Sequence, residues 1–241
     1  MIKMLEKNKF PQIILINPQL PENIGMSARA MMNCGFQNLR IVNPREKWPN
    51  ESAIKSSAHA KNIIKKTKVF NNIEEATSDL EFLIATSVRK RFERKKHFFD
   101  FNSLMRFIPN KSKVGIIFGP ENSGLNNEDI SKCNCIFSLP MENKDYSLNL
   151  AHSVLLVCYE FGRIKKNQIT EKENYLDVGS RKEFNALMDH LYEDLIKSGF
   201  LYPIPKRKVM FNNIRNMFLR SNFSSQEIKT FRGILTKLKK N

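Results

Sequence analysis

The sequence has 241 residues, of which 41% are hydrophobic, so it can build one domain of ordinary size with an appendage. Its 40 Lys and Arg outnumber 24 Asp and Glu and give a net charge of +16, which favours a polyanionic partner such as nucleic acid, although a lysine excess also fits an AT-rich genome. No apolar run approaches the roughly 20 residues that span a membrane, and the start MIKMLEKNKF lacks the apolar centre of a secretory signal. We therefore expect a cytoplasmic protein whose four cysteines are reduced thiols.

Five short apolar runs predict buried strands, at residues 13–16, 39–42, 82–85, 114–118 and 135–139. Helical patterns lie between and after these runs. One covers residues 24–34 and ends at Gly35, and another covers residues 150–161. Strands that alternate with helices are typical of an α/β domain with a mostly parallel sheet. We expect this domain to cover residues 1–162.

The composition changes after residue 162. Residues 163–180 are polar and aperiodic, which indicates a linker. Ser180 and Glu183 then have the spacing of a capping box, as do Ser224 and Glu227, and an apolar stripe at helical spacing follows each pair. A basic amphipathic helix is predicted between them, at residues 206–220. The sequence therefore predicts a small all-helical extension over residues 181–241.

Several common kinds of site are absent from the sequence. The stretch FGPENSG, residues 118–124, follows a predicted strand but lacks the Lys and Ser/Thr of a P-loop, and no GxGxxG follows the first strand. Cys133 and Cys135 have no partners at zinc-finger spacing, the four histidines are scattered, and there is no GxSxG. We therefore expect no nucleoside triphosphate, no NAD and no metal ion.

Polar residues gather instead where the predicted strands end. The first strand leads into NPQLPENIGMSARAM, residues 17–31, in which Asn23 can cap the next helix and Arg29 carries a positive charge. ATSVRK, residues 85–90, ends another strand with two hydroxyls, and YSLNLAHSV, residues 146–154, opens the last helix of the domain. Taken singly, each residue could be only a helix cap or a surface charge. Together they place hydroxyl, amide and carboxylate groups at the edge where open α/β sheets bind ligands.

Three stretches resemble, in order and spacing, the motifs of the SPOUT class of RNA 2′-O-methyltransferases: NPQLPENIGMSARA, FGPENSGLNNED and YSLNLAHSVLLVCYE. The ending FRGILTKLKK, after IRNMFLRSNFSSQEI, resembles the tail of the TrmJ-type branch of bacterial tRNA methyltransferases, so the likeness covers essentially the whole chain. It implies a SPOUT-type α/β domain with a C-terminal trefoil knot, a homodimer, and S-adenosylmethionine as methyl donor with S-adenosylhomocysteine as product. The implied reaction is 2′-O-methylation of cytidine or uridine at position 32 of the tRNA anticodon loop.

The resemblance also implies roles for single residues. Three loops would hold the methyl donor, through Thr86, Ser87 and Val88, through Gly119, and through Leu139, Tyr146, Ser147, Leu148 and Asn149. The catalytic set would be Arg29, Asn23, Glu121, Ser147 and Asn149. Arg29 would orient the ribose and stabilise negative charge on its oxygen, because a guanidinium group is a donor and not a base. Glu121 would hold Arg29 or a neighbouring amide, and Gly119, which has no Cβ, would let the backbone approach the ligand.

The basic residues would bind the tRNA backbone. The stretch RKRFERKK supplies Arg89, Lys90, Arg91, Arg94, Lys95 and Lys96, which we expect on a loop, and the tail adds Lys206, Arg207 and Lys208. Other interpretations remain open: a 2′-O-methyltransferase for ribosomal RNA or another tRNA position, and an RNA-binding protein that kept the fold without catalysis. A basic nucleic-acid-binding protein without a cofactor is a further alternative, but it leaves all three motifs unexplained.

Overall fold

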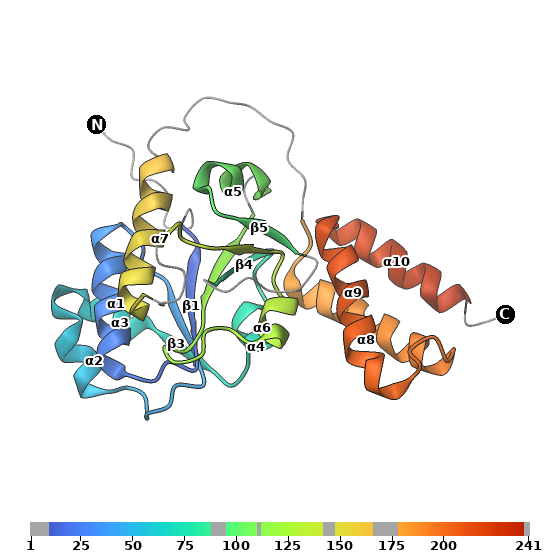
Figure 1. The fold of residues 1–241 in the computed structure, drawn as a ribbon, viewed down its shortest axis with the longest axis horizontal. Helices are drawn as coiled ribbons and strands as arrows, with labels where there is room; N and C mark the ends of the chain where they lie inside the picture. Colours follow the sequence, from blue (N-terminus) through green and yellow to red (C-terminus); the bar gives the residue numbers. More distant parts are fainter. Residues whose placement is uncertain (1–9, 88–94, 110–111, 142–147, 166–177, 239–241) are drawn as a thin grey trace.

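A seven-stranded sheet forms the centre of the molecule (Figure 1). The computed structural model describes residues 10–87, 95–109, 112–141, 148–165 and 178–238. The strands are β1 (Gln12–Ile16), β2 (Leu39–Val42), β3 (Lys68–Phe70), β4 (Phe82–Thr86), β5 (Lys96–Phe98), β6 (Val114–Phe118) and β7 (Cys135–Phe137). They lie in the order β3-β2-β1-β6-β4-β7-β5, and all neighbouring strands are parallel. The predicted α/β class with a mostly parallel sheet is confirmed.

The sequence does not predict the two edge strands, β3 and β5. Each has only three residues, and each pairs with a neighbour on one side alone. Lys68 and Val69 of β3 are exposed, as is Lys96 of β5, so neither strand has the continuous apolar run that marks a buried parallel strand. Lys96 was expected on a basic loop. That expectation is wrong, because the backbone of Lys96 pairs with β7.

Helices cover both faces of the sheet (Figure 1). One face carries α1 (Pro21–Asn33), α2 (Glu51–Ser56), α3 (Lys61–Lys66), α5 (Phe101–Phe107) and α7 (Leu150–Lys165), and the other carries α4 (Ile73–Thr77) and α6 (Asn127–Ser131). Strand residues alternate between these two layers. Ile13 and Leu15 therefore pack with α1, whereas Ile14 and Ile16 pack with α4. The helices predicted at residues 24–34 and 150–161 are both present, but α7 continues three residues past the expected domain end at residue 162.

Three helices form the tail: α8 (Arg181–Lys197), α9 (Arg207–Arg220) and α10 (Ser225–Leu238), with a 3-10 turn, Ile204–Lys206, before α9. They bury a core of their own, built around Phe184, Leu187, Phe211 and Ile228. The predicted capping box is present at the start of α8, where the Ser180 side chain accepts a hydrogen bond from the Glu183 amide and the Glu183 carboxylate accepts one from the Ser180 amide. The predicted helical extension is confirmed.

A buried arginine joins the tail to the sheet domain. The guanidinium of Arg181 donates to the carbonyl oxygen of Lys132 and, at 3.3 Å, to the Asn134 side chain. Burial lowers the pKa of Arg181 to about 10, so the group remains protonated at neutral pH. Asn134 in turn donates to the carbonyl of Leu219 and to the side chain of Asn222, both at 3.5 Å. Polar groups from the segment between α6 and β7, from the start of α8 and from the end of α9 thus meet in one junction.

Other features of the fold bear on the sequence predictions. The trefoil knot stays a prediction, because residues 142–147, which include the start of the third motif, lie outside the described ranges. The four cysteines lie in the described residues, and none of them forms a disulfide there. Within the described part of the chain, no helix is both long and apolar enough to cross a membrane.

Candidate active site

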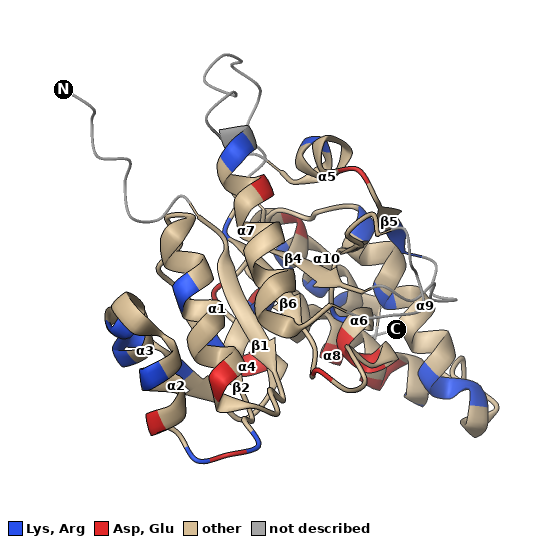
Figure 2. Ribbon diagram, turned by 60° about the vertical axis from the view of Figure 1, so that its left-hand side comes forward, with Lys and Arg blue, Asp and Glu red and all other residues tan. Residues whose placement is uncertain are grey.

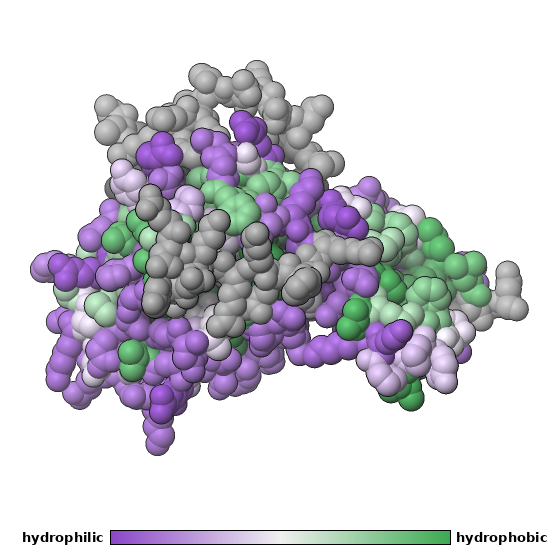
Figure 3. All heavy atoms as spheres, in the orientation of Figure 1, coloured by the Kyte–Doolittle hydropathy of each residue, from purple (hydrophilic) through white to green (hydrophobic). Residues whose placement is uncertain are grey.

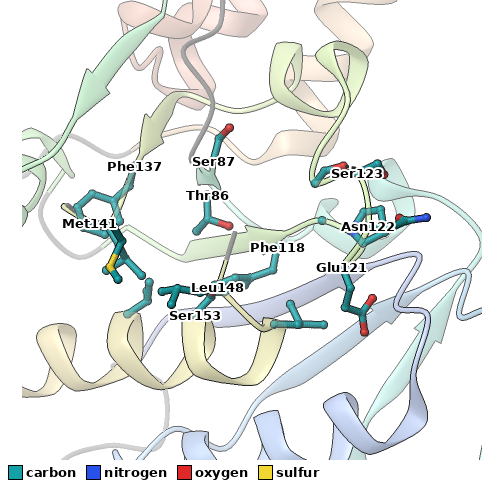
Figure 4. Close-up of a pocket in the computed structure, with 16 residues that line it drawn as sticks. Thr86, Ser87, Phe118, Glu121, Asn122, Ser123, Phe137, Met141, Leu148 and Ser153 are labelled. Carbon is teal, nitrogen blue, oxygen red and sulfur yellow. Dashed lines mark hydrogen bonds between the residues drawn. The ribbon is translucent and has the colours of Figure 1, made fainter. Parts of the chain in front are cut away.

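A pocket opens where the central strands end (Figure 4). Thr86 and Ser87 enter it from the end of β4, and residues 118–124 border it after β6. The exit of β7 and the start of α7 close the other sides (Figure 4). The further lining residues are Phe137, Leu139, Met141, Leu148, Leu150, Ser153 and Val157. The pocket thus combines an apolar wall with hydroxyl and backbone groups, and it lies at the carboxyl edge of the sheet where open α/β folds bind ligands.

The loop after β6 is folded tightly on itself. The Gly124 amide donates to the carbonyl of Pro120 at 2.8 Å, and Gly124 has a φ of +64°, which favours glycine. A Cβ on Gly119 would lie 2.3 Å from the backbone nitrogen of Leu125. The sequence suggested that Gly119 lets the backbone approach a ligand. In the structure, the residue is required by the closure of the loop itself, and it also lines the pocket.

Thr86 and Ser87 are fixed by bonds across neighbouring strands. The Thr86 hydroxyl donates to the carbonyl of Ile117 at 2.9 Å, and the Ser87 amide donates to the carbonyl of Phe137 at 3.1 Å. The Ser138 hydroxyl donates to the Ser87 carbonyl, and His97 Nε2 lies 2.7 Å from the same hydroxyl oxygen. Burial lowers the pKa of His97, which keeps its imidazole neutral near pH 7. Val88, the third expected contact of this loop, lies outside the described residues.

A chain of side-chain hydrogen bonds connects the three sequence motifs. The amide of Asn149 donates to the side-chain oxygen of Asn23 at 2.9 Å, and the amide of Asn23 donates to the Glu121 carboxylate at 2.8 Å. Asn149 also accepts from the backbone amides of Ala151 and His152, so it caps the start of α7. Residues separated by 126 and 98 positions in the chain are therefore joined beside the pocket. Three of the five predicted catalytic residues, Asn149, Asn23 and Glu121, form this chain of hydrogen bonds, which is called the relay below.

Asn23 was expected to cap α1, and that prediction is wrong. The helix begins at Pro21 with Leu20 as its N-cap, and it has no side-chain cap of its own. Proline suits the first helical position because it lacks the amide hydrogen that would be unpaired there. The Glu121 carboxylate caps the helix from a distance, accepting from the backbone amides of Gln19 at 2.8 Å and Leu20 at 3.3 Å. A carboxylate at a helix N-terminus also interacts favourably with the helix dipole.

Arg29 occupies a different place from the relay. It lies on α1 about 9 Å further along the helix axis than Asn23, given a rise of 1.5 Å per residue, and its side chain is exposed. Within the described residues, Arg29 does not line the pocket of its own chain. Ser147 and Tyr146 lie outside the described residues. The structure thus brings Asn23, Glu121 and Asn149 together and leaves Arg29 apart.

Sequence reasoning missed several residues of the pocket. Pro120, Asn122 and Ser123 lie within the quoted FGPENSG stretch, where they were passed over in favour of Gly119 and Glu121. Ser153 and Val157 follow Leu150 on α7 at spacings of three and seven residues, so helical periodicity could have placed them on the same face. Met141 and Phe137 follow no such pattern. In the described part of the chain, no group of three or more His, Cys, Asp and Glu side chains could hold a metal ion.

The predicted RNA-binding residues are only partly described. Arg89, Lys90, Arg91 and Arg94 lie outside the described residues. Lys95 donates to the backbone carbonyls of Ser131 and Cys133, so its charge is used within the fold. Lys206 is exposed, Arg207 donates to the carbonyl of Leu201, and Lys208 forms an ion pair of 2.7 Å with Glu128. Figure 2 shows the described basic residues spread over several elements, including α2, α3, β5 and the start of α9.

Comparison with known proteins decides the family. The model of the SpoU rRNA methylase family matches residues 11–159, which is more than half of the chain. The chain belongs to the SpoU methylase family. The model of the TrmJ tRNA methyltransferase C-terminal domain matches the tail, residues 182–241, which places this family member in the TrmJ branch. Membership confirms the class of enzyme expected from the motifs, an RNA methyltransferase.

Individual relatives agree with this assignment. The chain is 34% identical over 218 residues to a tRNA (cytidine-2′-O-)-methyltransferase TrmJ from Methanocaldococcus jannaschii, covering 85% of this chain and 90% of the relative. The crystal structure of TrmJ from Z. mobilis superimposes with a TM-score of 0.86 at 35% identity, covering 95% of this chain and 99% of that one. A more distant SpoU methyltransferase, AviRb from Streptomyces viridochromogenes, was solved with AdoMet and shares the fold alone, at 20% identity and a TM-score of 0.53 over 66% of this chain and 59% of that one.

Proposed function

We propose that this enzyme transfers the methyl group of S-adenosylmethionine to the ribose 2′-oxygen of cytidine or uridine at position 32 of the tRNA anticodon loop. The observation that supports it best is the relay from Asn149 through Asn23 to Glu121, which ties the three motif loops together beside one pocket. The anticodon-loop position follows from the resemblance of the tail, and the cytidine substrate agrees with the name of the archaeal relative.

The residues that line the pocket support S-adenosylmethionine as the methyl donor. Its apolar wall of Phe137, Leu139, Met141 and Leu148 suits an adenine ring, and the backbone of residues 118–124 offers hydrogen-bonding groups for polar parts. When bound, this donor would supply a methyl group on a positively charged sulfur. The Thr86 hydroxyl is bonded to the carbonyl of Ile117, which fixes this side chain where it can help to orient a donor. AviRb, which shares the fold, was solved with this compound.

The relay positions helix α1, and Arg29 contacts the RNA. Glu121 and Asn149 hold the first turn of α1 against the pocket, which fixes where the rest of α1 projects. Arg29 is exposed and can therefore orient a ribose and phosphate and stabilise negative charge on the attacking oxygen. The 2′-hydroxyl proton passes to a phosphate oxygen or to water, because a guanidinium is not a base.

The enzyme works as a homodimer. The outer sides of α1 and α7 expose Met26, Met32, Leu155, Leu156 and Tyr159, an apolar surface that association would cover. The two helices lie side by side, so these side chains can form one patch. Arg29 lies between Met26 and Met32, so dimer formation would place it beside a second protomer. Leu156→Glu should reduce the mass in solution from dimer to monomer by light scattering, and an unchanged mass would assign dimerisation to another surface.

Ribosomal RNA is the second candidate substrate, because the family model of the catalytic domain describes rRNA methylases. The tail argues for tRNA, since its own model describes a TrmJ domain. The test is incubation with radiolabelled S-adenosylmethionine and either unmodified tRNA or ribosomal RNA, followed by mapping of the labelled nucleoside.

We expect label at the 2′-oxygen of tRNA position 32, lost in Arg29→Ala and retained in Arg106→Ala, an exposed arginine on α5. Label at another position or in ribosomal RNA would keep the enzyme class and overturn the substrate. A protein that binds RNA but transfers no label to either substrate would favour the non-catalytic interpretation.

A further inference from the structure

The turn between α8 and α9, residues 198–206 and called the tail turn below, exposes aromatic rings. Phe200 is 58% exposed and Tyr202 is 74% exposed, while Leu201 between them is only 2% exposed. Ile204, at 66%, extends this apolar surface. Figure 3 shows hydrophobic and weakly polar side chains gathered on the outer end of the tail, whereas the described surface of the sheet domain on this face is mostly hydrophilic.

Leu201 anchors the tail turn to the helices. Its side chain is part of the tail core, its amide donates to the carbonyl of Leu195 at 3.3 Å, and its carbonyl accepts from the Arg207 side chain at 3.4 Å. The two rings on either side are therefore presented from a fixed backbone. Rigid presentation reduces the entropy lost when a ligand contacts them.

The charge around the rings identifies the kind of partner. Residues 197–209 read KSGFLYPIPKRKV and contain four basic and no acidic residues. Lysine is depleted from protein–protein interfaces, so a mixture of rings and lysines does not favour a protein partner. Exposed aromatic rings next to cations are instead the combination that binds single-stranded nucleic acid, through base stacking and phosphate contacts.

The tail turn is followed by a contact with the part of the sheet domain that carries the pocket loop. Lys208, two residues beyond the turn, forms its 2.7 Å ion pair with Glu128 on α6, and α6 follows directly after the pocket loop. An exposed pair of this kind contributes little stability. It nevertheless locates the start of α9 next to the element that follows the pocket loop, so an RNA whose reacting ribose reaches the pocket can also contact the tail turn.

We propose that the tail turn is a stacking platform for unpaired nucleobases of the RNA substrate, with Phe200 and Tyr202 contacting the bases and Lys206 contacting a phosphate. Bases within an A-form duplex are stacked on each other and unavailable, so the ligand is a loop or a single strand. This inference rests on the proposed function for its substrate, RNA, and adds to it a second contact region outside the pocket.

The test is binding of unmodified tRNA, measured by fluorescence anisotropy across a series of salt concentrations. The double variant Phe200→Leu, Tyr202→Leu should bind roughly tenfold or more weakly, because each stacked ring contributes substantially to affinity, and the slope of log affinity against log salt should not change. Lys206→Ala should instead lower the salt slope by about 1 with a smaller loss of affinity. Phe200→Trp should retain binding, and Ile234→Ala, an exposed apolar residue on α10, serves as the matched control.

Three results would overturn the platform. The first is tRNA affinity in the double variant equal to that of the control. The second is an equal loss of affinity for a blunt RNA duplex, which has no unpaired bases, because stacking would then not be the cause. The third is a change of mass by light scattering, which would make the turn an interface between copies of this chain. Thermal unfolding of each variant checks that the fold is retained.

Failure of the proposed function is distinguishable from failure of the platform. If the unmodified enzyme transfers no methyl group to any RNA but the ring variants still lose tRNA affinity, the function is wrong and the platform stands. If methyl transfer proceeds and the ring variants bind tRNA normally, the platform alone is wrong.

Discussion

Glu121 illustrates how one side chain can serve three backbone or side-chain donors from a distant part of the chain. Its two oxygens accept from the amides of Gln19 and Leu20 and from the side chain of Asn23. The family resemblance assigned Glu121 to the site and implied that it holds Arg29 or a neighbouring amide; the partners in the structure are amides. Neither spacing nor periodicity could show that it caps α1, because the partners are about 100 positions apart and meet only when β1 and β6 pair.

Replacing this carboxylate should destabilise the protein as well as the site. In Glu121→Ala, three donors lose their partner, so we expect the free energy of unfolding to fall by about 1–3 kcal/mol. Glu121→Gln, which retains one oxygen, should lie between this variant and the unmodified protein. Urea unfolding measures both. The matched control is Glu22→Ala, an exposed glutamate in the first turn of the same helix; equal midpoints for Glu121→Ala and Glu22→Ala would contradict the capping role.

We expect the free energy of unfolding to depend on pH because of His97. Its pKa in the folded protein lies below the ordinary value of 6.5 because burial disfavours the charged imidazole. The unfolded chain therefore takes up a proton more readily, and the stability from His97 is fully present above pH 6.5 and is lost as the pH falls below it. We expect the unfolding midpoint in urea to decrease more steeply between pH 6.5 and 5.5 in the unmodified protein than in His97→Gln. Parallel curves would exclude His97 as the cause.

At the scale of elements, hydrophobic patterning in the sequence predicted the buried strands. The five buried strands were placed within two residues of their observed ends, because each carries a run of apolar side chains buried on both faces. The edge strands β3 and β5 depend on pairing with a neighbouring strand, and the start of α1 depends on Glu121. Both partners are distant in the sequence, so no local pattern could predict these elements. The pocket residues of the motif loops were available from resemblance, whereas Met141 and Phe137 required the fold.

The contact between α1 and α2 requires a glycine. A Cβ on Gly25 would lie 2.0 Å from the Ser56 hydroxyl oxygen and 2.2 Å from the carbonyl oxygen of Ala53. The serine can rotate, but the carbonyl belongs to the backbone of α2, so the helices would have to separate. Alanine in a helix is otherwise favoured over glycine by up to about 1 kcal/mol.

Two glycine substitutions should therefore have opposite effects. Gly25→Ala should lower the free energy of unfolding by about 1–3 kcal/mol, the usual cost of overpacking. Among the described residues, a Cβ on Gly162 of α7 would meet the carbonyl oxygen of Cys34 at 3.7 Å, an ordinary contact, so Gly162→Ala should be neutral or stabilise by up to about 1 kcal/mol. Thermal and urea unfolding of the pair give the comparison, and a stabilised Gly25→Ala would show that α2 can move without cost.

On the scale of the whole molecule, Arg181 makes the tail part of the same folded unit as the sheet. The sequence analysis did not select Arg181, which is the first residue of a predicted helix. A cation is unfavourable at a helix N-terminus, and that mismatch is the one local sign that Arg181 has a partner elsewhere. Its partners, Lys132 and Asn134, belong to the segment between α6 and β7.

Without this junction, the helical tail should unfold at a lower temperature than the sheet domain. Arg181→Met retains the length of the side chain but removes its hydrogen bonds, so we expect docking to weaken by about 1–3 kcal/mol. Calorimetry should show one transition for the unmodified protein and a second, earlier one for the variant. Lys182→Met, at the exposed neighbouring position, is the control. A single unshifted transition in Arg181→Met would mean that the tail docks without it.

The order of strands in the sheet also governs how the chain can fold during its synthesis. Strands β1, β2 and β3 can pair as soon as they are made, but both neighbours of β4, namely β6 and β7, come later in the chain. Until Val114 and the residues after it have been added, the apolar strand Phe82–Thr86 has two unpaired edges, which favours association with other chains. A chain that ends before residue 114 should therefore aggregate when it leaves the ribosome, whereas a chain extended through β7 should remain in the supernatant after centrifugation.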